Sequence, residues 1–356
     1  MITKIKFGKV SNKKFFDKLN LCFDQRTPFV AYRKKNSIDL ICHIDNNCIS
    51  VKSLKGCKPG FFFMPFDRSN PGYKISLENS LATQLDNKKI THSNLNSIKN
   101  LKSSEKQKKK YLKSVTKIIE KIGKSNLSKV VYSDVFEFEN VEKNSINHFK
   151  KLLNSHFDAL CYLFYHPNEG CWLGASPETL INLNNSNLKT VALAGTKKKE
   201  ANKWTRKEIE EQKIVEKYIV NKLKPICQKV NTTKKETIKA GGVEHLKSTI
   251  EGVSKHPVSD IIKTIHPTPA VAGFPLKKAL TVIKDLEKHK RFFYTGYFGI
   301  ISEGWCETYV NLRCVNIIKD KALVYVGGGI TYDSTPVSEW NEIILKSETI
   351  LKIFAD

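Results

Sequence analysis

Four glutamates in two pairs carry the clearest chemical signal in this 356-residue chain. Glu208 and Glu211 lie three residues apart, as do Glu339 and Glu342, and both pairs lie in stretches with a helical pattern of apolar residues. On a helix this spacing puts both carboxylates of a pair on one face. If the two helices meet, four carboxylates converge into a set of oxygen ligands suited to Mg²⁺. One such pair alone is usually only the exposed face of a helix. The residues around the two pairs therefore decide whether the pairs indicate a metal site.

Several neighbours have side chains or backbones that could bind an anionic substrate. Lys346 follows Glu342 by one helical turn, and Gly327-Gly328-Gly329 precedes the second pair and could expose backbone N–H groups. Glu178 ends a Gly-Ala-Ser-Pro-Glu turn, and Leu193-Ala194-Gly195-Thr196 predicts a strand that runs into a turn. The three prolines of the segment 266–275 exclude regular helix or strand there. Each segment alone also suits an ordinary loop or, around Ser176, a helix start.

The elements that must position these residues are predicted from periodicity. Long helices are expected over 102–124, 206–224 and 338–353, where apolar residues recur at helical spacing. Short apolar runs bounded by Gly, Pro and Asn predict strands, at 29–33, 37–44, 60–65, 129–138, 159–165, 172–174, 190–194, 292–301, 308–318 and 322–326. Runs of strands with helices between and after them indicate an α/β (α+β) fold in one structural domain, without regular βαβ repeats.

Composition excludes several classes of protein. No run of 18 apolar residues exists and the first residues lack an apolar signal region, so we expect no membrane association and a cytoplasmic location. The nine cysteines form no Cys-x-x-Cys pair, which argues against zinc or a disulfide framework. The formal charge of +25 suggests nucleic acid as a partner, but the excess is mostly lysine spread along the chain, without a recognition helix or aromatic platform. We therefore expect no nucleic-acid partner.

An ordered series of motifs resembles the chorismate-binding enzymes, which include anthranilate, aminodeoxychorismate, isochorismate and salicylate synthases. The motifs are Lys129-Val130-Val131, Ser176-Pro177-Glu178, Leu193-Ala194-Gly195-Thr196, Lys207-Glu208-Ile209-Glu210-Glu211-Gln212, His245-Leu246, His266-Pro267-Thr268-Pro269-Ala270, Tyr294-Thr295-Gly296, Asn311-Leu312-Arg313, Gly327-Gly328-Gly329-Ile330 and Glu339-Trp340-Asn341-Glu342. The resemblance covers residues 105–356, the expected catalytic region, whereas residues 1–104 match loosely, as the variable N-terminal part of the fold.

This resemblance implies a fold and a set of roles. The fold is one domain of face-to-face β-sheets flanked by helices, as in aminodeoxychorismate synthase, with chorismate bound in a cleft between them. Mg²⁺ would be held by Glu211 and Glu342, supported by Glu208 and Glu339, and would hold a carboxylate of chorismate. The substrate-binding positions would be Gly195, Thr196, His245, Ala270, Tyr294, Arg313, Gly327 and Lys346. An arginine suits this role because its planar fork pairs with a carboxylate through two hydrogen bonds.

The subclass depends on what attacks C2 of the chorismate ring. Water-using members carry lysine at the position of Lys129, whereas ammonia-using anthranilate synthases have glutamine there. Ala194 stands where some aminodeoxychorismate synthases have a nucleophilic lysine, which disfavours a covalent route. We therefore expect an isochorismate synthase, an isomerase in which Lys129 is the general base for water and protonated Glu178 is the general acid for the departing C4 hydroxyl.

Alternatives stay open at this point. Salicylate synthase, which expels pyruvate from the same intermediate, is the nearest rival, although Ala270 replaces the threonine typical of those relatives. An ammonia-using synthase and a catalytically inactive scaffold follow. Two departures from the family pattern are Asp134, where arginine is common, and Gln212, where histidine is usual. We expect a monomer that needs no glutamine amidotransferase subunit, with a product used in menaquinone or siderophore synthesis.

Overall fold

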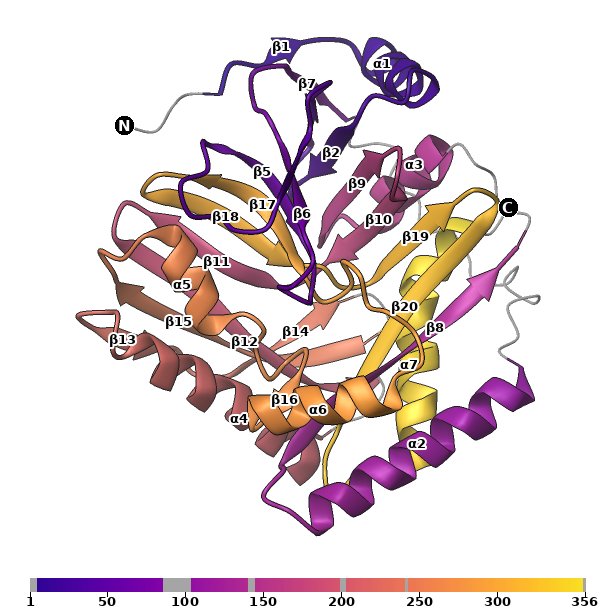
Figure 1. Ribbon diagram of the computed structural model, residues 1–356, viewed down its shortest axis with the longest axis vertical. Coiled ribbons are helices and arrows are strands. Elements are labelled where there is room, and N and C mark those ends of the chain that lie inside the picture. The colour runs from indigo at the N-terminus through magenta and orange to yellow at the C-terminus, as the bar shows by residue number, and fades with distance from the viewer. Residues whose placement is uncertain (1–4, 86–103, 140–144, 199–202, 241–242, 355–356) are drawn as a thin grey trace.

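The structure is a computed structural model that describes residues 5–85, 104–139, 145–198, 203–240 and 243–354. Two large, mainly antiparallel sheets lie face to face, and helices cover the outer side of each (Figure 1). This arrangement of helix, sheet, sheet and helix layers confirms the predicted mixed α/β class.

The first sheet is 10-stranded and joins segments from both halves of the chain. Its spatial order is β1 (Gly8–Lys9), β7 (Ser80–Gln84), β3 (Asp39–Ile44), β2 (Phe29–Arg33), β9 (Leu160–His166), β10 (Gly170–Ser176), β19 (Cys314–Ile318), β20 (Lys321–Ile330), β8 (Lys129–Phe138) and β16 (Gly273–Phe274). Within it, β1 and β7 pair in parallel.

The second sheet is also 10-stranded, and β14 joins it beside the main path. Its order is β13 (Val230–Thr232), β15 (Val243–Val253), β12 (Asn187–Lys198), β11 (Thr179–Asn184), β18 (Trp305–Val310), β17 (Tyr297–Ser302), β5 (Gly60–Met64), β6 (Gly72–Ile75) and β4 (Ile49–Val51), with β14 (Glu236–Ala240) on β15. N-terminal strands therefore belong to both sheets, because β2 pairs with β9 and β5 pairs with β17.

The helices divide between the two outer faces. They are α1 (Asn12–Asp24), α2 (Glu105–Gly123), α3 (Ser145–Ser155), α4 (Arg206–Leu223), α5 (Val258–Ile265), α6 (Leu276–Leu286), α7 (Pro336–Leu351) and the 3₁₀ turn η3 (Lys352–Phe354). Residues of α1, α2, α3, α6 and α7 share a core with the first sheet, and those of α4 and α5 share one with the second. In the described part of the chain, no helix is long and apolar enough to cross a membrane.

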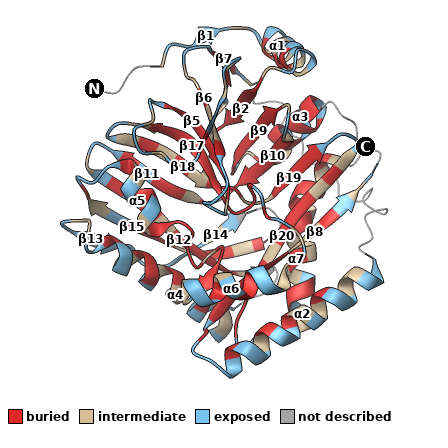
Figure 2. Ribbon diagram, viewed as in Figure 1, coloured by how far each residue is buried: buried red, intermediate tan, exposed pale blue. Residues whose placement is uncertain are grey.

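Because side chains alternate between the two faces of each strand, the molecule has three hydrophobic cores. In β9, Leu160, Tyr162 and Phe164 face the space between the sheets, whereas Cys161 and Leu163 face the helices. Because successive side chains of a strand point to opposite faces, a strand buried on both sides is apolar throughout. The middle core is mainly aromatic, and Figure 2 shows the strands of both sheets as the most buried part of the molecule.

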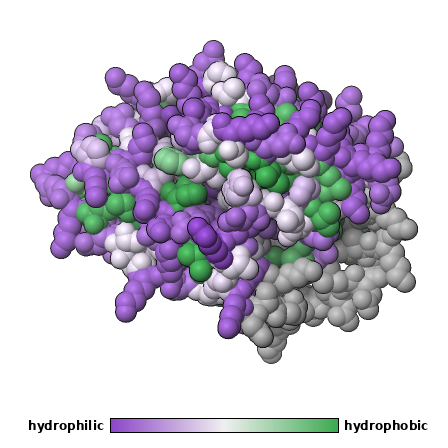
Figure 3. Space-filling view, turned by 90° about the horizontal axis from the view of Figure 1, so that it is seen from below, coloured by the Kyte–Doolittle hydropathy of each residue, from purple (hydrophilic) through white to green (hydrophobic). Residues whose placement is uncertain are grey.

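The helix predicted at 102–124, which is rich in lysine, is half-buried, as its pattern of apolar residues predicts. Helix α2 buries Tyr111, Val115, Ile118 and Ile122, while most of its lysines are exposed. Figure 3 shows the molecule from below, the side that α2, α4 and α6 cover in Figure 1, with mostly hydrophilic residues and small, separate hydrophobic areas. The lysines of α2 therefore form a solvated helix face.

Several predicted elements differ from the structure. The strand predicted at 322–326 continues through the glycines 327–329 as β20, which pairs with β8. The strand predicted to run into a turn at Gly195 instead continues to Lys198 as β12, with a bulge between Ala194 and Thr196. The segment 266–275, where no strand was expected, holds the two-residue strand β16. The predicted strand 292–301 begins only at Tyr297, and the predicted strand 308–318 is broken at residues 311–313, where Arg313 has a φ of 49°. Both errors arise because apolar residues also fill a buried connection between two sheets, which periodicity cannot distinguish from a strand.

Candidate active site

Two neighbouring crossovers between the sheets position Glu178 and Arg313. The chain leaves the first sheet at the end of β10 and enters the second at β11, with Glu178 between them. It returns from β18 to β19 through residues 311–313. The crossovers are tied together, because Val310 N–H donates to the Glu178 carbonyl at 3.0 Å and Ala175 N–H donates to the Arg313 carbonyl at 3.1 Å. Both side chains are thus placed where the two sheets meet.

Lys129 begins β8 and is completely buried. Its Nζ lies 2.9 Å from Oε1 of Glu211 on α4. Gly329, on the neighbouring strand, allows this approach. A Cβ atom there would lie 2.3 Å from Glu211 Oε1 and 2.9 Å from Lys129 Cε. The bare backbone of β20 therefore provides the space in which these two charged groups meet.

The other acidic residues also face lysines across the junction of α4 and α7. Lys207 Nζ on α4 lies 2.5 Å from Glu339 Oε1 and 3.9 Å from Glu342 Oε2 on α7. Lys346 Nζ lies 2.7 Å from Glu342 Oε1 and donates to the Gly327 carbonyl at 3.2 Å. The structure therefore brings Glu211, Glu339 and Glu342 together around residues 327–329, each with a lysine partner.

Burial and mutual charge shift the pKa values in this cluster. Burial and then the neighbouring Glu342 raise the pKa of Glu339 to about 7, against the pull of Lys207. Burial alone would raise the pKa of Glu342, but Lys346 and Lys207 lower it. Burial alone would also lower the pKa of Lys207, but Glu342, Glu339 and Glu211 raise it well above its ordinary value. The lysines thus stabilise the charged carboxylates in their buried setting.

Glu339 has a buried oxygen without a protein partner. The residue is fully buried, and its Oε2 has no hydrogen-bond partner among the described residues. Such an atom is costly unless a cation or water satisfies it. In the described part of the chain, no three acidic, histidine or cysteine side chains are already gathered as a metal-binding group. The donor chemistry suits a divalent cation, but lysines compete for the carboxylates.

Glu208 has a different partner from the other three glutamates. Its Oε2 accepts hydrogen bonds from the backbone N–H of Thr205, at 3.0 Å, and from the Thr205 hydroxyl. These contacts form a capping box at the start of α4. The carboxylate is therefore engaged in starting the helix that carries Glu211.

Glu178 is held in its protonated form at neutral pH. The side chain is 3% exposed, and burial raises its pKa to about 8, while the charge of Lys129 acts in the opposite direction. Because the charge of Lys129 acts on the pKa of Glu178, the two side chains lie close enough to interact electrostatically. A carboxyl group with this pKa can donate a proton near neutral pH.

His245 links the predicted substrate residues on β12 to Arg313. Its Nδ1 lies 2.9 Å from the Gly195 carbonyl, and its Nε2 lies 2.8 Å from Nη2 of Arg313. Because the guanidinium can only donate, Nε2 accepts, and Nδ1 carries the proton that it donates to Gly195. Burial, followed by Arg313 and Lys346, lowers the pKa of His245 to about 3, which agrees with a neutral ring.

The remaining predicted residues have the following surroundings. Gly195 forms a bulge in β12 with a φ of 75°, and a Cβ atom there would lie 2.9 Å from the Glu208 carbonyl. The Thr196 hydroxyl lies 3.3 Å from His245 Nδ1. A Cβ atom on Gly327 would lie 2.9 Å from the Tyr294 hydroxyl, so that hydroxyl also reaches β20. Ala270 is partly buried against the core of the second sheet.

The two departures from the family pattern have structural roles. Asp134 lies on β8 and accepts hydrogen bonds from the N–H of Val135 at 2.9 Å and from Nε2 of Gln107 at 3.2 Å. It thus covers a strand edge that is unpaired there among the described strands. Gln212 is buried, and its Nε2 donates to Glu216 and to Ser248, both at 3.1 Å. Asp134 thus supplies an acceptor for donors at the strand edge, and Gln212 supplies a donor for two buried oxygen atoms.

Lys207 belongs to the site although the motif analysis gave it no role. It precedes Glu211 by four residues, a spacing that puts both on one helix face. That spacing was the only local signal, because the partners Glu339 and Glu342 are more than 130 residues away in sequence. Only the packing of α4 beside α7 brings them together.

Comparisons with known proteins show which family the chain belongs to. Residues 72–355 match the model of the family described as chorismate binding enzyme. The chain is 33% identical over 210 residues to "Isochorismate synthase 2, chloroplastic" of Arabidopsis thaliana, covering 55% of this chain and 37% of the relative. It is 30% identical over 213 residues to "Isochorismate synthase MenF" of Pasteurella multocida, covering 54% of this chain and 49% of the relative. The chain thus spans about half or less of these curated relatives.

A solved structure shares the fold over most of both chains. Superposition on MenF, described as the menaquinone-specific isochorismate synthase from Escherichia coli, gives a TM-score of 0.77 with 20% identity over 92% of this chain and 89% of that one. The shared fold confirms the two packed sheets with flanking helices. The family match, which covers most of the chain, places this protein in the chorismate-binding enzyme family.

Proposed function

We propose that this protein is an isochorismate synthase, an isomerase that converts chorismate to isochorismate. The observation that carries the proposal is the pair formed by Lys129 and Glu178, an amine and a protonated carboxyl group that are both buried where the two sheets meet. Moving a hydroxyl group from C4 to C2 requires a base for the incoming water and an acid for the leaving hydroxyl. These two residues have the chemistry for both roles.

The proposed reaction assigns one task to each group. Lys129 takes a proton from water as the water oxygen bonds to C2. The two ring double bonds shift from C1=C2 and C5=C6 to C1=C6 and C4=C5 as the C4–O bond breaks. Glu178 donates its proton to the C4 hydroxyl, which leaves as water. Arg313, oriented by His245 at 2.8 Å, pairs with a substrate carboxylate, and Lys346 adds positive charge nearby.

Magnesium fits the residues that the structure places around the glycines of β20. Glu211, Glu339 and Glu342 would hold the ion, and the unpartnered Oε2 of Glu339 supports this assignment. When bound, the ion neutralises and orients a carboxylate of the substrate. Glu211, which pairs with Lys129 at 2.9 Å, would then turn to the ion, and the Lys129 side chain would be released toward the substrate. Glu208 supports the site through the helix cap rather than as a direct ligand.

The names of the relatives and the residue types distinguish this proposal from its rivals. Both relatives compared above are named isochorismate synthases. Lys129 favours water over ammonia as the nucleophile, and Ala270 favours retention of the pyruvyl group over its loss as in salicylate synthases. The chain alone contains both proposed catalytic groups, so we propose that it needs no amidotransferase subunit.

Incubation with chorismate and Mg²⁺, followed by chromatography, tests the proposal. The expected product is isochorismate, without salicylate, pyruvate or, when ammonium is added, anthranilate. Salicylate with equimolar pyruvate would make the protein a salicylate synthase, and anthranilate would make it an ammonia-using synthase. Either result would refute the proposal.

Variants of the two proposed catalytic residues test their roles. Because general acid and base steps each contribute about 10²–10⁴-fold, Lys129→Ala and Glu178→Gln should each lower kcat by at least about 100-fold. Lys124→Ala and Glu210→Gln, changes of the same kind at exposed positions, serve as controls and should leave kcat unchanged. Circular dichroism should show all four variants folded. A kcat within about tenfold of the parent for either site variant would contradict the assignment.

A further inference from the structure

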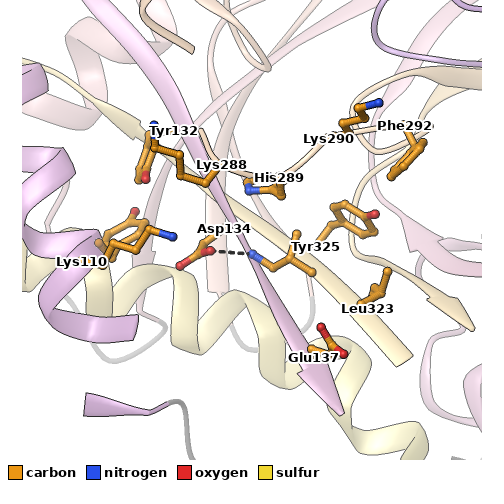
Figure 4. A pocket seen from close by; sticks show the side chains of 12 residues that line it. Lys110, Tyr132, Asp134, Glu137, Lys288, His289, Lys290, Phe292, Leu323 and Tyr325 are labelled. Atoms are coloured by element: carbon orange, nitrogen blue, oxygen red, sulfur yellow. Dashed lines mark hydrogen bonds between the residues drawn. The ribbon is translucent and has the colours of Figure 1, made fainter. Parts of the chain in front are cut away.

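A second cavity lies along β8, away from the catalytic groups. It has a volume of about 340 Å³ and is lined by residues of α2, β8, β20 and the segment 288–292. Figure 4 shows Lys110, Tyr132, Asp134, His289 and Tyr325 around it. Tyr132, the lining residue nearest to Lys129 along the strand, lies three residues from it, which corresponds to roughly 10 Å at the rise of an extended chain. None of the residues that line the cavity is a proposed catalytic, metal-binding or substrate-binding residue.

The uncompensated charge in this cavity is positive. Lys110, Lys288 and Lys290 line it and are exposed, and within the described residues none of them forms a salt bridge or a protein hydrogen bond. The two carboxylates of the lining have partners already. Asp134 accepts from Val135 and Gln107, and Glu137 pairs with Lys321 at 2.6 Å. Although Lys110 lies close enough to lower the pKa of Asp134, the cavity offers more free cations than free anions.

The walls of the cavity are flat and aromatic. Tyr132 and Tyr325 are buried in its lining, and Phe292 lies at its edge with 50% of its surface exposed. Phe292 also has a φ of 48°, which is rare for a bulky side chain. An exposed aromatic residue held in an unfavourable backbone conformation is a feature often found at ligand sites.

One lining side chain has an unsatisfied polar atom. Tyr111 is 1% exposed, and its hydroxyl has no hydrogen-bond partner among the described residues. A buried hydroxyl without a partner costs free energy that a ligand or water can recover. Tyr111 therefore adds an unsatisfied polar group to a lining whose lysines supply the positive charge.

A peptide strand is a poor occupant of this place. The N–H of Ser133, on the open edge of β8, donates to Glu287 at 2.8 Å, and that of Val135 donates to Asp134. The Val135 carbonyl accepts from Gln107 at 2.9 Å. Because side chains already bind these backbone groups, an added strand would find no free N–H or C=O groups to pair with. A small molecule fits better, since ligand cavities begin at about 300 Å³.

We propose that this cavity is a second ligand site, which binds a small aromatic carboxylate through the three lysines and the faces of Tyr132, Tyr325 and Phe292. The ring lies against the aromatic walls, and the carboxylate lies toward Lys288 and Lys290. The cavity also touches residues of the catalytic region, because Tyr325 stacks on Tyr294 with ring centroids 5.4 Å apart and Ser133 pairs with Gly327. A ligand in this cavity therefore affects the position of β20 and Tyr294 without occupying the cleft that binds chorismate.

Binding of 4-fluorobenzoate, followed by ¹⁹F NMR line broadening, tests the proposal on the full chain. The double variant Lys288→Met/Lys290→Met should bind at least about tenfold more weakly, because it loses the charge-assisted hydrogen bonds from both ammonium groups to the carboxylate. Phe292→Ala should also weaken binding. The matched controls are Lys277→Met/Lys284→Met on the exposed face of α6 and Phe7→Ala, and both should bind as the parent does.

Two further measurements distinguish this site from the catalytic cleft. Saturating chorismate should leave 4-fluorobenzoate bound, and the Lys288→Met/Lys290→Met variant should keep the parent's basal activity. Fluoroacetate, which carries the charge without the ring, should bind much more weakly. Displacement by chorismate, equal binding by the variant and the parent, or no binding at about 10 mM probe would each overturn the proposal.

Discussion

At the scale of single residues, the site depends on ionisable groups whose charge is set by their surroundings. Glu178 has no counter-ion partner at hydrogen-bond distance among the described residues, and burial raises its pKa to about 8. Glu342 lies between two lysines, and its pKa is lowered. The same side-chain type is therefore suited to donate a proton in one place and to stay charged in another, because desolvation dominates in the first and neighbouring cations dominate in the second.

The pH dependence of kcat/KM should show the protonation of Glu178. Since the carboxyl group must be protonated to act as an acid, kcat/KM should fall as pH rises through about 8, by about tenfold per pH unit beyond it. Steady-state assays from about pH 6 to pH 10 with constant Mg²⁺ would measure this limb. A flat profile to the alkaline end would show that Glu178 is not the acid.

The stability of the same protein provides an independent check. Because the folded state binds the Glu178 proton more tightly than the unfolded state, its contribution to stability falls as pH rises from about 4.5 to about 8. The Glu178→Gln variant does not undergo this loss. Its melting temperature minus that of the parent should therefore increase as pH rises across that range.

Lys207 should act as the cation that satisfies the acidic residues when no metal is bound. Replacing it in Lys207→Met removes the partner of buried Glu339 and should cost up to about 3–5 kcal/mol, and less to the extent that Glu339 takes up a proton. Mg²⁺ should then raise the melting temperature of the variant more than that of the parent. Lys213→Met, which breaks an exposed pair with Glu210 on the same helix, is the control. An equal response to Mg²⁺ in all three proteins would contradict this role.

At the scale of elements, the strand β20 matters because it lacks side chains where the acidic residues meet. Its residues 327–329 pair with β8. The Cβ positions of Gly327 and Gly329 face the Tyr294 hydroxyl and Glu211, and that of Gly328 faces Glu339 on the other side of the strand. The helices α4 and α7 can therefore bring their carboxylates close to the sheet. A strand with ordinary side chains in this segment would fill the space that the charged groups occupy.

Gly329→Ala should therefore damage the site more than an alanine elsewhere. The new Cβ atom would lie 2.3 Å from Glu211 Oε1, so the carboxylate and Lys129 must move, at a cost of about 1–3 kcal/mol and with a large loss of kcat. Gly123→Ala at the end of α2 is the control, since its Cβ would meet only the Tyr332 ring at 3.3 Å. Urea denaturation and kcat measured on both variants decide the matter, and parent-like activity of Gly329→Ala would contradict it.

At the scale of the whole molecule, an aromatic core holds the two sheets together. Phe63 on β5 stacks on Phe164 on β9, with ring centroids 4.3 Å apart and an angle of 8° between the rings. Trp172, Phe293 and Phe298 surround the same ring. Since the crossovers that carry Glu178 and Arg313 begin and end in these sheets, the spacing of the sheets also affects where these two side chains lie.

Phe63→Ala should show this coupling between core and site. Truncation of a buried phenylalanine costs about 3–5 kcal/mol, and the free energy of unfolding in urea should fall by that amount. We also expect a lower kcat in the folded variant, because the sheets can shift toward each other. Phe7→Ala, at a position that is 37% exposed, should change neither quantity. A fall in stability with parent-like kcat would show that the site does not depend on this core.

Local sequence determined much of the fold and the membership of the site. The strands 29–33 and 129–138 have the predicted bounds, and α4 begins at Arg206 as expected, because apolar alternation and helical spacing act over a few residues. The helices α1, α3, α5 and α6 were not predicted. The resemblance named Lys129, Glu178, Arg313 and the paired glutamates, since their motifs are local too.

Only the tertiary structure decided how those residues are used. It directs Glu208 to the cap of α4, gives Lys207 to Glu339 and Glu342, and makes the ring of His245 an acceptor for Arg313. The pKa of Glu178 likewise depends on burial between the sheets. These outcomes rest on contacts between segments far apart in the chain, and the free energy of a buried charge depends on every group around it, which local sequence does not specify.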